Sequence, residues 1–297
     1  MEIVSPDGAE VIVRSSADTT SVGDWALVLE AAGIAHRVTQ TQTKDSWVVT
    51  VSPTDLSAAA GALDAYDAES RAPQQEAALP PQADSILGIV VAVLLLAAYV
   101  VMGPRDTVEP TAWFRAGSAS AELIVRGQWW RAVTALTLHA DLLHLFGNAV
   151  ASLIFVAAVG RWLGSGVAAL LILLGGTAGN LLTAIIHRTG HISVGASTAT
   201  FAALGILAGL QVVRRLRFGP LRRRAWLPLG AGLALFAMLG VGERSDIFAH
   251  LFGLGTGCLL GAAAALVLPR RLRSTFQVAL GVVSLTLLIL SWALAFR

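Results

Sequence analysis

The sequence has little charge and almost no cysteine. Only 13% of its 297 residues are charged, against about 25% in an average soluble protein. In contrast, 55% are hydrophobic and the mean hydropathy is +0.70, so the chain is expected to be an integral membrane protein. A single cysteine, Cys258, excludes an intrachain disulfide. The first residues, MEIVSPDGAE, lack the basic stretch and apolar run of a signal peptide, and none is expected.

The few charges are distributed unevenly along the chain. Residues 1–84 contain 13 of the 19 acidic residues but only 4 of the 21 basic ones. The rest of the chain is therefore basic as well as strongly apolar. This division predicts an acidic soluble head followed by a membrane-embedded body.

The head reads as a small α+β domain over residues 1–70. Strand-like and helix-like patterns alternate in the order βαββα, over 10–14, 24–34, 35–41, 46–52 and 54–69. It contains no recognisable nucleophile, metal cluster or phosphate-binding loop, which favours a regulatory or docking module over an enzyme. Residues 71–84, RAPQQEAALPPQAD, read as a linker rich in proline, glutamine and alanine.

Residues 85–297 are predicted to form an all-α polytopic membrane domain. A hydrocarbon core about 30 Å thick needs about 20 apolar residues per helix. Seven runs approach that length, over 86–102, 142–162, 166–187, 193–213, 226–242, 247–268 and 276–295. The segment 103–135 is too polar to span and is expected to lie at the membrane interface.

Arginine-rich loops predict the orientation of these spans. RRLRFGPLRRR at 214–224 contains six arginines and PRRLR at 269–273 contains three, while Arg161 ends the second span. Alternate threading of seven spans puts all three on one side, which is cytoplasmic by the positive-inside rule. The acidic head then lies in the cytoplasm, and residues 103–135 face outward.

Polar groups inside a membrane are costly, so each one is a functional candidate. Ser197 and His250 both lie a few residues inside their spans, counted from the outer side. His144 and Asn148 are four residues apart and share one helix face near the same side. Histidine is the usual base that activates a serine, and histidine, asparagine and backbone N–H groups can stabilise an oxyanion. No Asp or Glu lies deep in a span, so a Ser–His dyad is predicted.

Other interpretations of these residues have to be weighed. A lone serine or histidine in a span often serves packing or transport, but a transporter would usually show midplane charges and inverted repeats, which we do not detect. There is no H-E-x-x-H motif and no pair of buried aspartates, which disfavours the metal and aspartyl proteolytic chemistries. The cluster of His139, Asp141 and His144 lacks a convincing metal spacing, and His139 and His191 are expected to be solvated. We therefore predict no metal site.

Three blocks of the sequence together resemble the rhomboid intramembrane serine proteases. GQWWRAVTALTLHADLLHLFGNA at 127–149 resembles the family's Trp-Arg loop and H-x-x-x-N helix. GASTATFAALG at 195–205 resembles its G-x-S-G nucleophile motif, and AHLFGLGTG at 249–257 resembles its A-H-x-x-G-x-x-x-G helix. The fold implied is a six-helix core with one further C-terminal transmembrane helix, which is one known layout of the family.

The resemblance implies a reaction and a set of residue roles. Ser197 would be the nucleophile and His250 the general base, and His144 and Asn148 would stabilise the oxyanion with the Ser197 N–H. Supporting roles fall to Gly195, Ala196 and Thr198 in the nucleophile motif, to Gly253, Gly257 and Gly261 in helix packing, and to Trp130 and Arg131 as anchors of the outer loop at the membrane surface. The substrates would be single-span membrane proteins in a lipid bilayer, cleaved in or near their transmembrane segments. Neither a cofactor nor nucleic acid is implied.

One position departs from the family pattern. The residue after the serine is usually glycine, whereas here it is Thr198. Threonine is still small, so activity is expected to survive with an altered substrate preference. The alternative is an inactive rhomboid-like protein that binds transmembrane helices. Either protein would be a multi-pass protein of a bacterial cell membrane, and the head could have a cytoplasmic partner.

Overall fold

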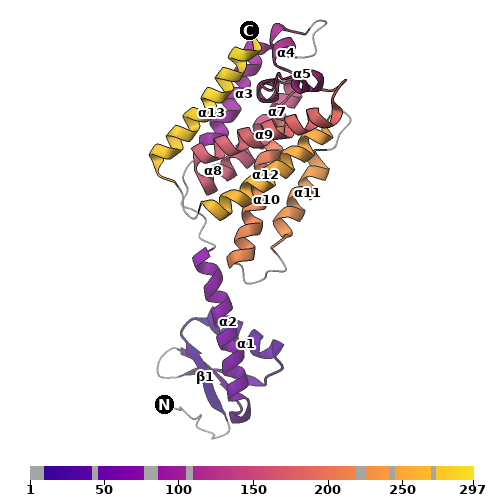
Figure 1. The fold of residues 1–297 in the computed structure, drawn as a ribbon. Coiled ribbons are helices and arrows are strands. Elements are labelled where there is room, and N and C mark those ends of the chain that lie inside the picture. Colours follow the sequence, from indigo (N-terminus) through magenta and orange to yellow (C-terminus); the bar gives the residue numbers. More distant parts are fainter. Residues whose placement is uncertain are drawn as a thin grey trace. The chain divides into compact units, whose positions relative to one another are not determined.

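A computed structural model describes residues 10–41, 46–76, 86–104, 110–218, 225–240, 245–268 and 272–297 of the chain. The chain divides into two compact units, Met1–Ala78 and Leu79–Arg297 (Figure 1). The first contains all the strands of a three-stranded sheet, and the second is almost entirely helical. Each unit is described separately below.

The N-terminal unit has the predicted βαββα order. Its elements are β1 (Val11–Ser16), α1 (Thr19–Ala31), β2 (His36–Thr41), β3 (Ser46–Val51) and α2 (Leu56–Glu76). The strands pair antiparallel in the order β1-β3-β2. Leu29, Val49 and Leu63 are fully buried between the sheet and the two helices. Asp18 caps α1 by accepting from the amides of Thr20 and Ser21, which satisfies two N–H groups that a helix start leaves free.

The predicted linker begins within helix α2. Helix α2 continues to Glu76, through RAPQQE, in spite of Pro73. A proline inside a helix removes a backbone hydrogen bond and crowds the carbonyl four residues earlier, whereas the alanine, glutamine and glutamate around it are strong helix formers. The remainder of the predicted linker, 77–84, lies outside the described residues.

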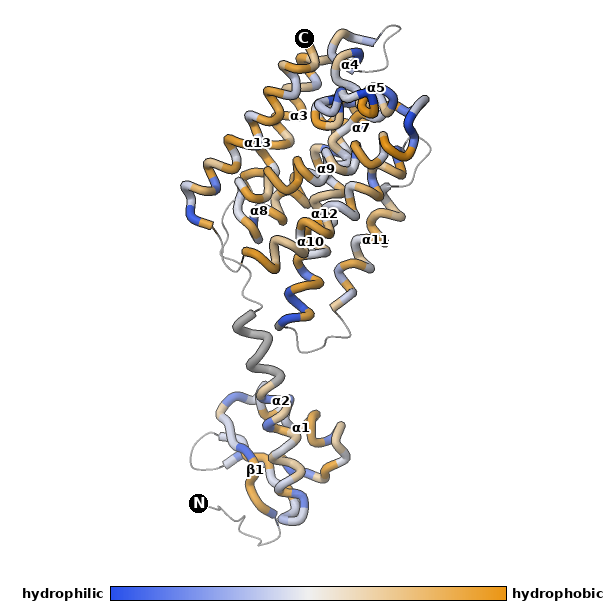
Figure 2. Tube along the Cα trace, viewed as in Figure 1, coloured by the Kyte–Doolittle hydropathy of each residue, from blue (hydrophilic) through white to orange (hydrophobic). Residues whose placement is uncertain are grey.

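The second unit is a multi-pass membrane domain. Figure 2 shows the hydropathy along the chain, and hydrophobic residues are frequent along its long helices. Its single helices are α3 (Ile86–Met102), α9 (Ser165–His187), α10 (Ser197–Phe218), α11 (Leu227–Leu239), α12 (Ile247–Val267) and α13 (Ser274–Ala295). A further helix is continuous over three elements, α7 (Leu142–Ala151), the π-helical turn η3 (Ser152–Val156) and α8 (Ala157–Leu163). In the part of the chain that the structure describes, five stretches are long and apolar enough to span: 142–163, 165–187, 197–217, 247–267 and 274–295. The other two predicted spans, α3 and α11, are apolar helices of only 17 and 13 residues.

The fourth predicted span begins too early. Residues Ile192–Ser193 form a short strand, β5, paired with β4 (Ala119–Ser120), and α10 begins only at Ser197. Gly195 has φ +124°, a backbone conformation that cannot continue into a helix. The consequence is that Ser197 lies at the very start of α10.

The segment 103–135 contains no spanning helix in its described part. It forms the short helices α4 (Ala112–Gly117), α5 (Ala121–Val125) and α6 (Arg131–Thr134), followed by the 3₁₀ turn η2 (Ala135–Thr137). Through β4 this segment pairs with the strand that leads to Ser197. The predicted interfacial loop is therefore an ordered layer attached to the start of α10.

Glycines set the separation of the central helices. A Cβ atom at Gly253, Gly257 or Gly261 of α12 would overlap the carbonyl oxygens of Thr198, Ala202 or Ile206 in α10. Small residues allow two membrane helices to approach until their backbones touch. The glycine face predicted for α12 thus lies at its contact with α10, and this contact brings the first turns of both helices together.

Candidate active site

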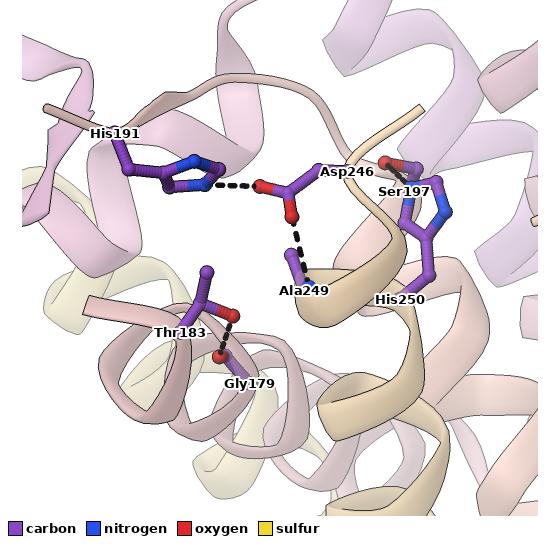
Figure 3. Close-up of polar contacts among 7 residues, drawn as sticks. All are labelled: Gly179, Thr183, His191, Ser197, Asp246, Ala249 and His250. Atoms are coloured by element: carbon purple, nitrogen blue, oxygen red, sulfur yellow. Dashed lines mark hydrogen bonds and ion pairs between the residues drawn. The ribbon is translucent and has the colours of Figure 1, made fainter. Parts of the chain in front are cut away.

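Ser197 and His250 are in hydrogen-bond contact at the start of two packed helices. His250 Nε2 lies 2.8 Å from Ser197 Oγ (Figure 3). His250 is 6% exposed, whereas Ser197 is partly exposed. The two residues are 53 positions apart in the sequence, and the close packing of α10 on α12 joins them.

The second ring nitrogen of His250 determines which tautomer is present. His250 Nδ1 lies 3.0 Å from the carbonyl oxygen of Gly240, and a carbonyl can only accept a hydrogen bond. Nδ1 therefore carries the hydrogen, and the lone pair of Nε2 is free to accept the Ser197 proton. The ring also lies against Phe201, with centroids 4.6 Å apart. Among the described residues no carboxylate bonds to His250, and a backbone carbonyl orients it instead.

Gly195 explains how His144 reaches the nucleophile. A Cβ at Gly195 would lie 2.5 Å from His144 Cε1 and 3.6 Å from Ser197 Oγ, so both side chains surround this glycine. The Gly195 amide donates to the Ala135 carbonyl at 2.9 Å, which fixes the backbone in its unusual conformation. Only glycine satisfies both the positive φ and the close approach of the imidazole.

Asn148 lies one helical turn beyond His144. It is 5% exposed, and its Nδ2 donates to the His144 carbonyl at 3.1 Å. The structure therefore brings Ser197, His250 and His144 together directly. The Nδ2 group carries two hydrogens, so Asn148 has a second N–H that could donate to an oxyanion while the first stays bonded to the helix backbone.

The two residues beside the nucleophile are buried and face away from solvent. Ala196 packs against Leu95 and Leu145, on α3 and α7. Thr198 is 2% exposed, and a Cβ at Gly179 of α9 would lie 2.6 Å from its methyl carbon. The Thr198 side chain therefore fills space between α9 and α12, beside Gly179 and Gly253.

The buried side chain of Arg131 binds the backbone of the segment 103–135 that contains it. It is only 7% exposed, whereas a surface position was predicted. Its guanidinium donates to the carbonyls of Arg115 and Ser118 at 3.0 and 3.1 Å and to Gln128 Oε1 at 2.6 Å. Burial lowers the pKa of Arg131 from its ordinary value. The guanidinium thus fixes the chain just before β4, while neighbouring Trp130 remains partly exposed.

His139 is buried, and the expectation that it is solvated is wrong. It is 1% exposed, and its ring lies edge-on to His144 with centroids 5.3 Å apart. Burial and the neighbouring His144 lower the pKa of His139 to about 4. Its Nδ1 is buried without a hydrogen-bond partner. Within the described ranges, no group of three or more His, Cys, Asp or Glu side chains could hold a metal ion.

Asp246 and His191 form a polar contact that was not predicted from the sequence. Asp246 caps α12 by accepting from the Ala249 amide at 3.0 Å, and its other oxygen lies 2.8 Å from His191 Nε2 (Figure 3). A signal for the cap was present, since an Asp just before an apolar run is a typical helix N-cap. Its pairing with a residue 55 positions earlier depends on the fold and leaves no trace in the sequence.

Comparisons with known proteins agree on one family. The family model described as "Rhomboid domain" matches residues 126–267, a range that includes all three sequence blocks and every candidate site residue. The chain is 31% identical over 137 residues to YdcA of Bacillus subtilis, and this alignment covers 46% of the chain and 68% of that protein.

Two further relatives are matched over a smaller part of their length. Rhomboid protease GluP of Bacillus subtilis is 32% identical over 159 residues, which are 52% of this chain and 29% of GluP. RHOMBOID-like protein 1 of Arabidopsis thaliana is 33% identical over 147 residues, which are 49% of this chain and 37% of that protein. The chain therefore spans well under half of the length of these two relatives.

Proposed function

Because this chain belongs to the rhomboid family, we propose that it is an intramembrane serine endopeptidase with Ser197 as nucleophile and His250 as general base. The observation that carries the proposal is the 2.8 Å contact between Ser197 Oγ and His250 Nε2. Family membership supports transmembrane substrates in general. Cleavage in or near a single-span substrate's transmembrane segment is the finer part of the proposal.

The first half of the reaction makes an acyl-enzyme. His250 Nε2 takes the Ser197 proton as Oγ attacks the scissile carbonyl carbon, and the carbonyl oxygen becomes an oxyanion. The Gly240 carbonyl accepts from His250 Nδ1 and stabilises the imidazolium that forms. The tetrahedral intermediate then collapses, His250 gives its proton to the leaving amine, and the C–N bond breaks.

The second half releases the product by hydrolysis. His250 takes a proton from water, whose oxygen attacks the acyl carbon. Collapse of this second intermediate breaks the ester bond, and the proton returns to Ser197 Oγ. Every proton is carried by His250, so these steps need no cofactor.

Oxyanion stabilisation is assigned to the groups around Gly195. The His144 ring and the Ser197 side chain both lie against this glycine, so the ring and the backbone N–H of Ser197 are the first candidates. Asn148 is the third, through the Nδ2 hydrogen that does not bond to the His144 carbonyl. Removal of one oxyanion donor commonly lowers kcat by about 10² to 10³.

The membrane setting constrains how a substrate reaches the serine. A helix with all its backbone groups hydrogen-bonded cannot present a carbonyl for attack, so the substrate has to unwind locally. Ser197 begins a spanning helix, so the reaction would occur close to one membrane face. The arginines of 214–224 begin in the last turns of α10, and those of 269–273 follow α12, so both groups lie at the helix ends opposite Ser197 and His250. By the positive-inside rule, the protein would sit in a bacterial cell membrane with its N-terminus cytoplasmic and its site near the outer face.

The test uses purified full-length protein in detergent or liposomes. We would measure labelling by a fluorophosphonate probe and cleavage of a transmembrane substrate for the wild type, Ser197→Ala and His250→Ala. Ser291→Ala is the matched control, because Ser291 lies in α13 and its hydroxyl donates to the Leu287 carbonyl at 2.8 Å. We expect loss of labelling and cleavage in the first two variants alone. A folded wild type that neither labels nor cleaves any of several substrates would favour the inactive helix-binding alternative.

A further inference from the structure

The carboxylate of Asp246 connects the two chain segments that end in Ser197 and His250 (Figure 3). One oxygen accepts from the Ala249 amide at 3.0 Å, which ties it to the start of α12. The other lies 2.8 Å from Nε2 of His191, in the loop before α10. This contact is mostly shielded, with side-chain exposures of 23% for His191 and 16% for Asp246.

The spacing of these groups relates them to the dyad. Asp246 precedes His250 by four residues and Ser193 precedes Ser197 by four residues. The His250 amide also donates to the Asp246 carbonyl at 3.0 Å, so the cap and the base share one helical turn. Asp246 therefore lies about one helical turn before His250, and Ser193 lies in β5, just before the start of α10.

Asp246 is held in its ionised form. Burial raises its pKa, but hydrogen bonds from the Ala249 amide, the Ser193 hydroxyl and His191 outweigh burial and lower the pKa below its ordinary value. An ionised carboxylate only accepts, so His191 Nε2 carries the hydrogen between them. The same carboxylate thus receives donors from α12, from the loop and from β5.

The partner side chain is itself fixed. The His191 ring stacks on His187 of α9 at 4.1 Å with an interplanar angle of 8°, and His187 in turn lies edge-on to Phe248 at 5.1 Å. The backbone of His191 is held as well, because its carbonyl accepts from the Ala121 amide at 2.9 Å. Exposed ion pairs contribute little because two mobile side chains have to be ordered. Here the side chains of His191 and Asp246 are both held in place, so their contact can fix the start of α12 relative to the segment that leads into α10.

We propose that Asp246 is a positioning residue for the Ser197–His250 dyad and that it acts through His191. This inference rests on the proposed function. The glycine contacts of α10 with α12 fix the helices along their length, whereas helix ends are less stable than helix centres and both dyad residues lie in first turns. The Asp246–His191 contact joins the start of α12 to the segment that leads into α10, and so holds these two helix ends together. A displacement of about 1 Å in a catalytic contact can lower a rate by about 10².

The experiment has to separate two roles of Asp246, its contact with His191 and its capping of α12. Asp246→Ser keeps an oxygen that can cap α12 but is too short to reach His191. His191→Phe keeps the ring on His187 and removes the donor, whereas His191→Gln keeps a donor for Asp246. Asp18→Ser makes the same change at the cap of α1 in the other unit and serves as the control. The readouts are the fluorophosphonate labelling rate, kcat and KM on a transmembrane substrate, and Tm.

We expect Asp246→Ser and His191→Phe to slow labelling and lower kcat by about 10-fold to 100-fold, with KM changed by less than about twofold. The double variant should be no slower than the slower single variant, because both changes break one link. His191→Gln should recover most of the rate, and Asp18→Ser should match the wild type.

Two results would overturn the inference while leaving the proposed function standing. One is an active wild type whose two single variants label within twofold of it. The other is a double variant whose loss equals the product of the two single losses. If wild type and Ser197→Ala are equally unreactive, the proposed function itself has failed and this inference fails with it.

Discussion

Gly195 lies directly beneath the imidazole of His144. A Cβ at this position would come within 2.5 Å of Cε1 and 2.7 Å of Nε2 of the ring, and the backbone φ is +124°. The glycine two positions before the serine thus has two separate reasons to be there. It lets the chain turn from β5 into α10, and it lets the imidazole approach the hydroxyl of Ser197.

Gly195→Ala is expected to lower kcat by about 100-fold or more. The added methyl group displaces His144 from the oxyanion position, and a lost oxyanion donor alone is worth about 10² to 10³. Gly190→Ala is the matched control, because Gly190 also has positive φ, +71°, but a Cβ added there would meet no atom within 4 Å. Substrate cleavage and Tm should be measured for both. Equal losses of activity in the two variants would attribute the effect to backbone strain and not to His144.

Thr198→Gly is expected to destabilise the protein while leaving the dyad competent. The Thr198 methyl group fills the space beside Gly179 and Gly253, so its removal leaves a cavity and adds a glycine to a helix. Together these changes lower the free energy of unfolding by about 1–3 kcal/mol. Thr198→Ala separates the two terms, because it creates most of the cavity without the glycine penalty. Thermal unfolding and labelling rates check this, and a large gain in labelling rate with glycine would show that Thr198 hinders the nucleophile.

Much of this architecture could be predicted from patterns that are local in the sequence. The five long spans follow from apolar runs of about 20 residues, and the βαββα head follows from alternating and helical periodicities. Proximity of Ser197, His250 and His144 was predicted because each lies near the same end of its span. Helix length and threading alone bring such residues to one depth.

What could not be predicted depends on contacts between distant segments. Strands β4 and β5 have two residues each, too few for any periodicity, and yet their pairing determines where α10 begins. Arg131 reads as a membrane-surface arginine because its partners are backbone carbonyls, which exist at every position and carry no sequence signal. The Asp246–His191 pair was missed for a related reason, since neither residue stands out until the fold joins them.

Arg131→Met is expected to destabilise the protein strongly. The methionine retains most of the apolar stem, but the carbonyls of Arg115 and Ser118 lose their donor in a buried setting. Leaving buried acceptors unpaired costs about 1–3 kcal/mol each. Arg126→Met is the matched control, because Arg126 is 70% exposed and pairs with Glu122 one turn away on the surface. Tm should fall by several degrees for the first variant and hardly at all for the second. Similar falls in Tm for both variants would contradict the conclusion that Arg131 stabilises the segment before β4.

The buried His139 is expected to make the protein sensitive to mild acid. Its pKa is about 4 in the folded protein because of burial and the adjacent His144, against 6.5 in an unfolded chain. Between these values the unfolded chain binds a proton that the folded protein does not, so stability is full above about pH 6.5 and is lost as the pH falls toward 4. The loss at pH 4 approaches about 3 kcal/mol. His139→Gln removes this titration while the amide oxygen can still accept from the Ala196 amide, which lies 3.5 Å from His139 Nε2. The fall in Tm between pH 7.5 and pH 4.5 should therefore be smaller in the variant, whatever its absolute Tm, because every other titrating group is common to both proteins. An identical fall in the two proteins would mean that His139 takes up its proton equally well when folded and unfolded.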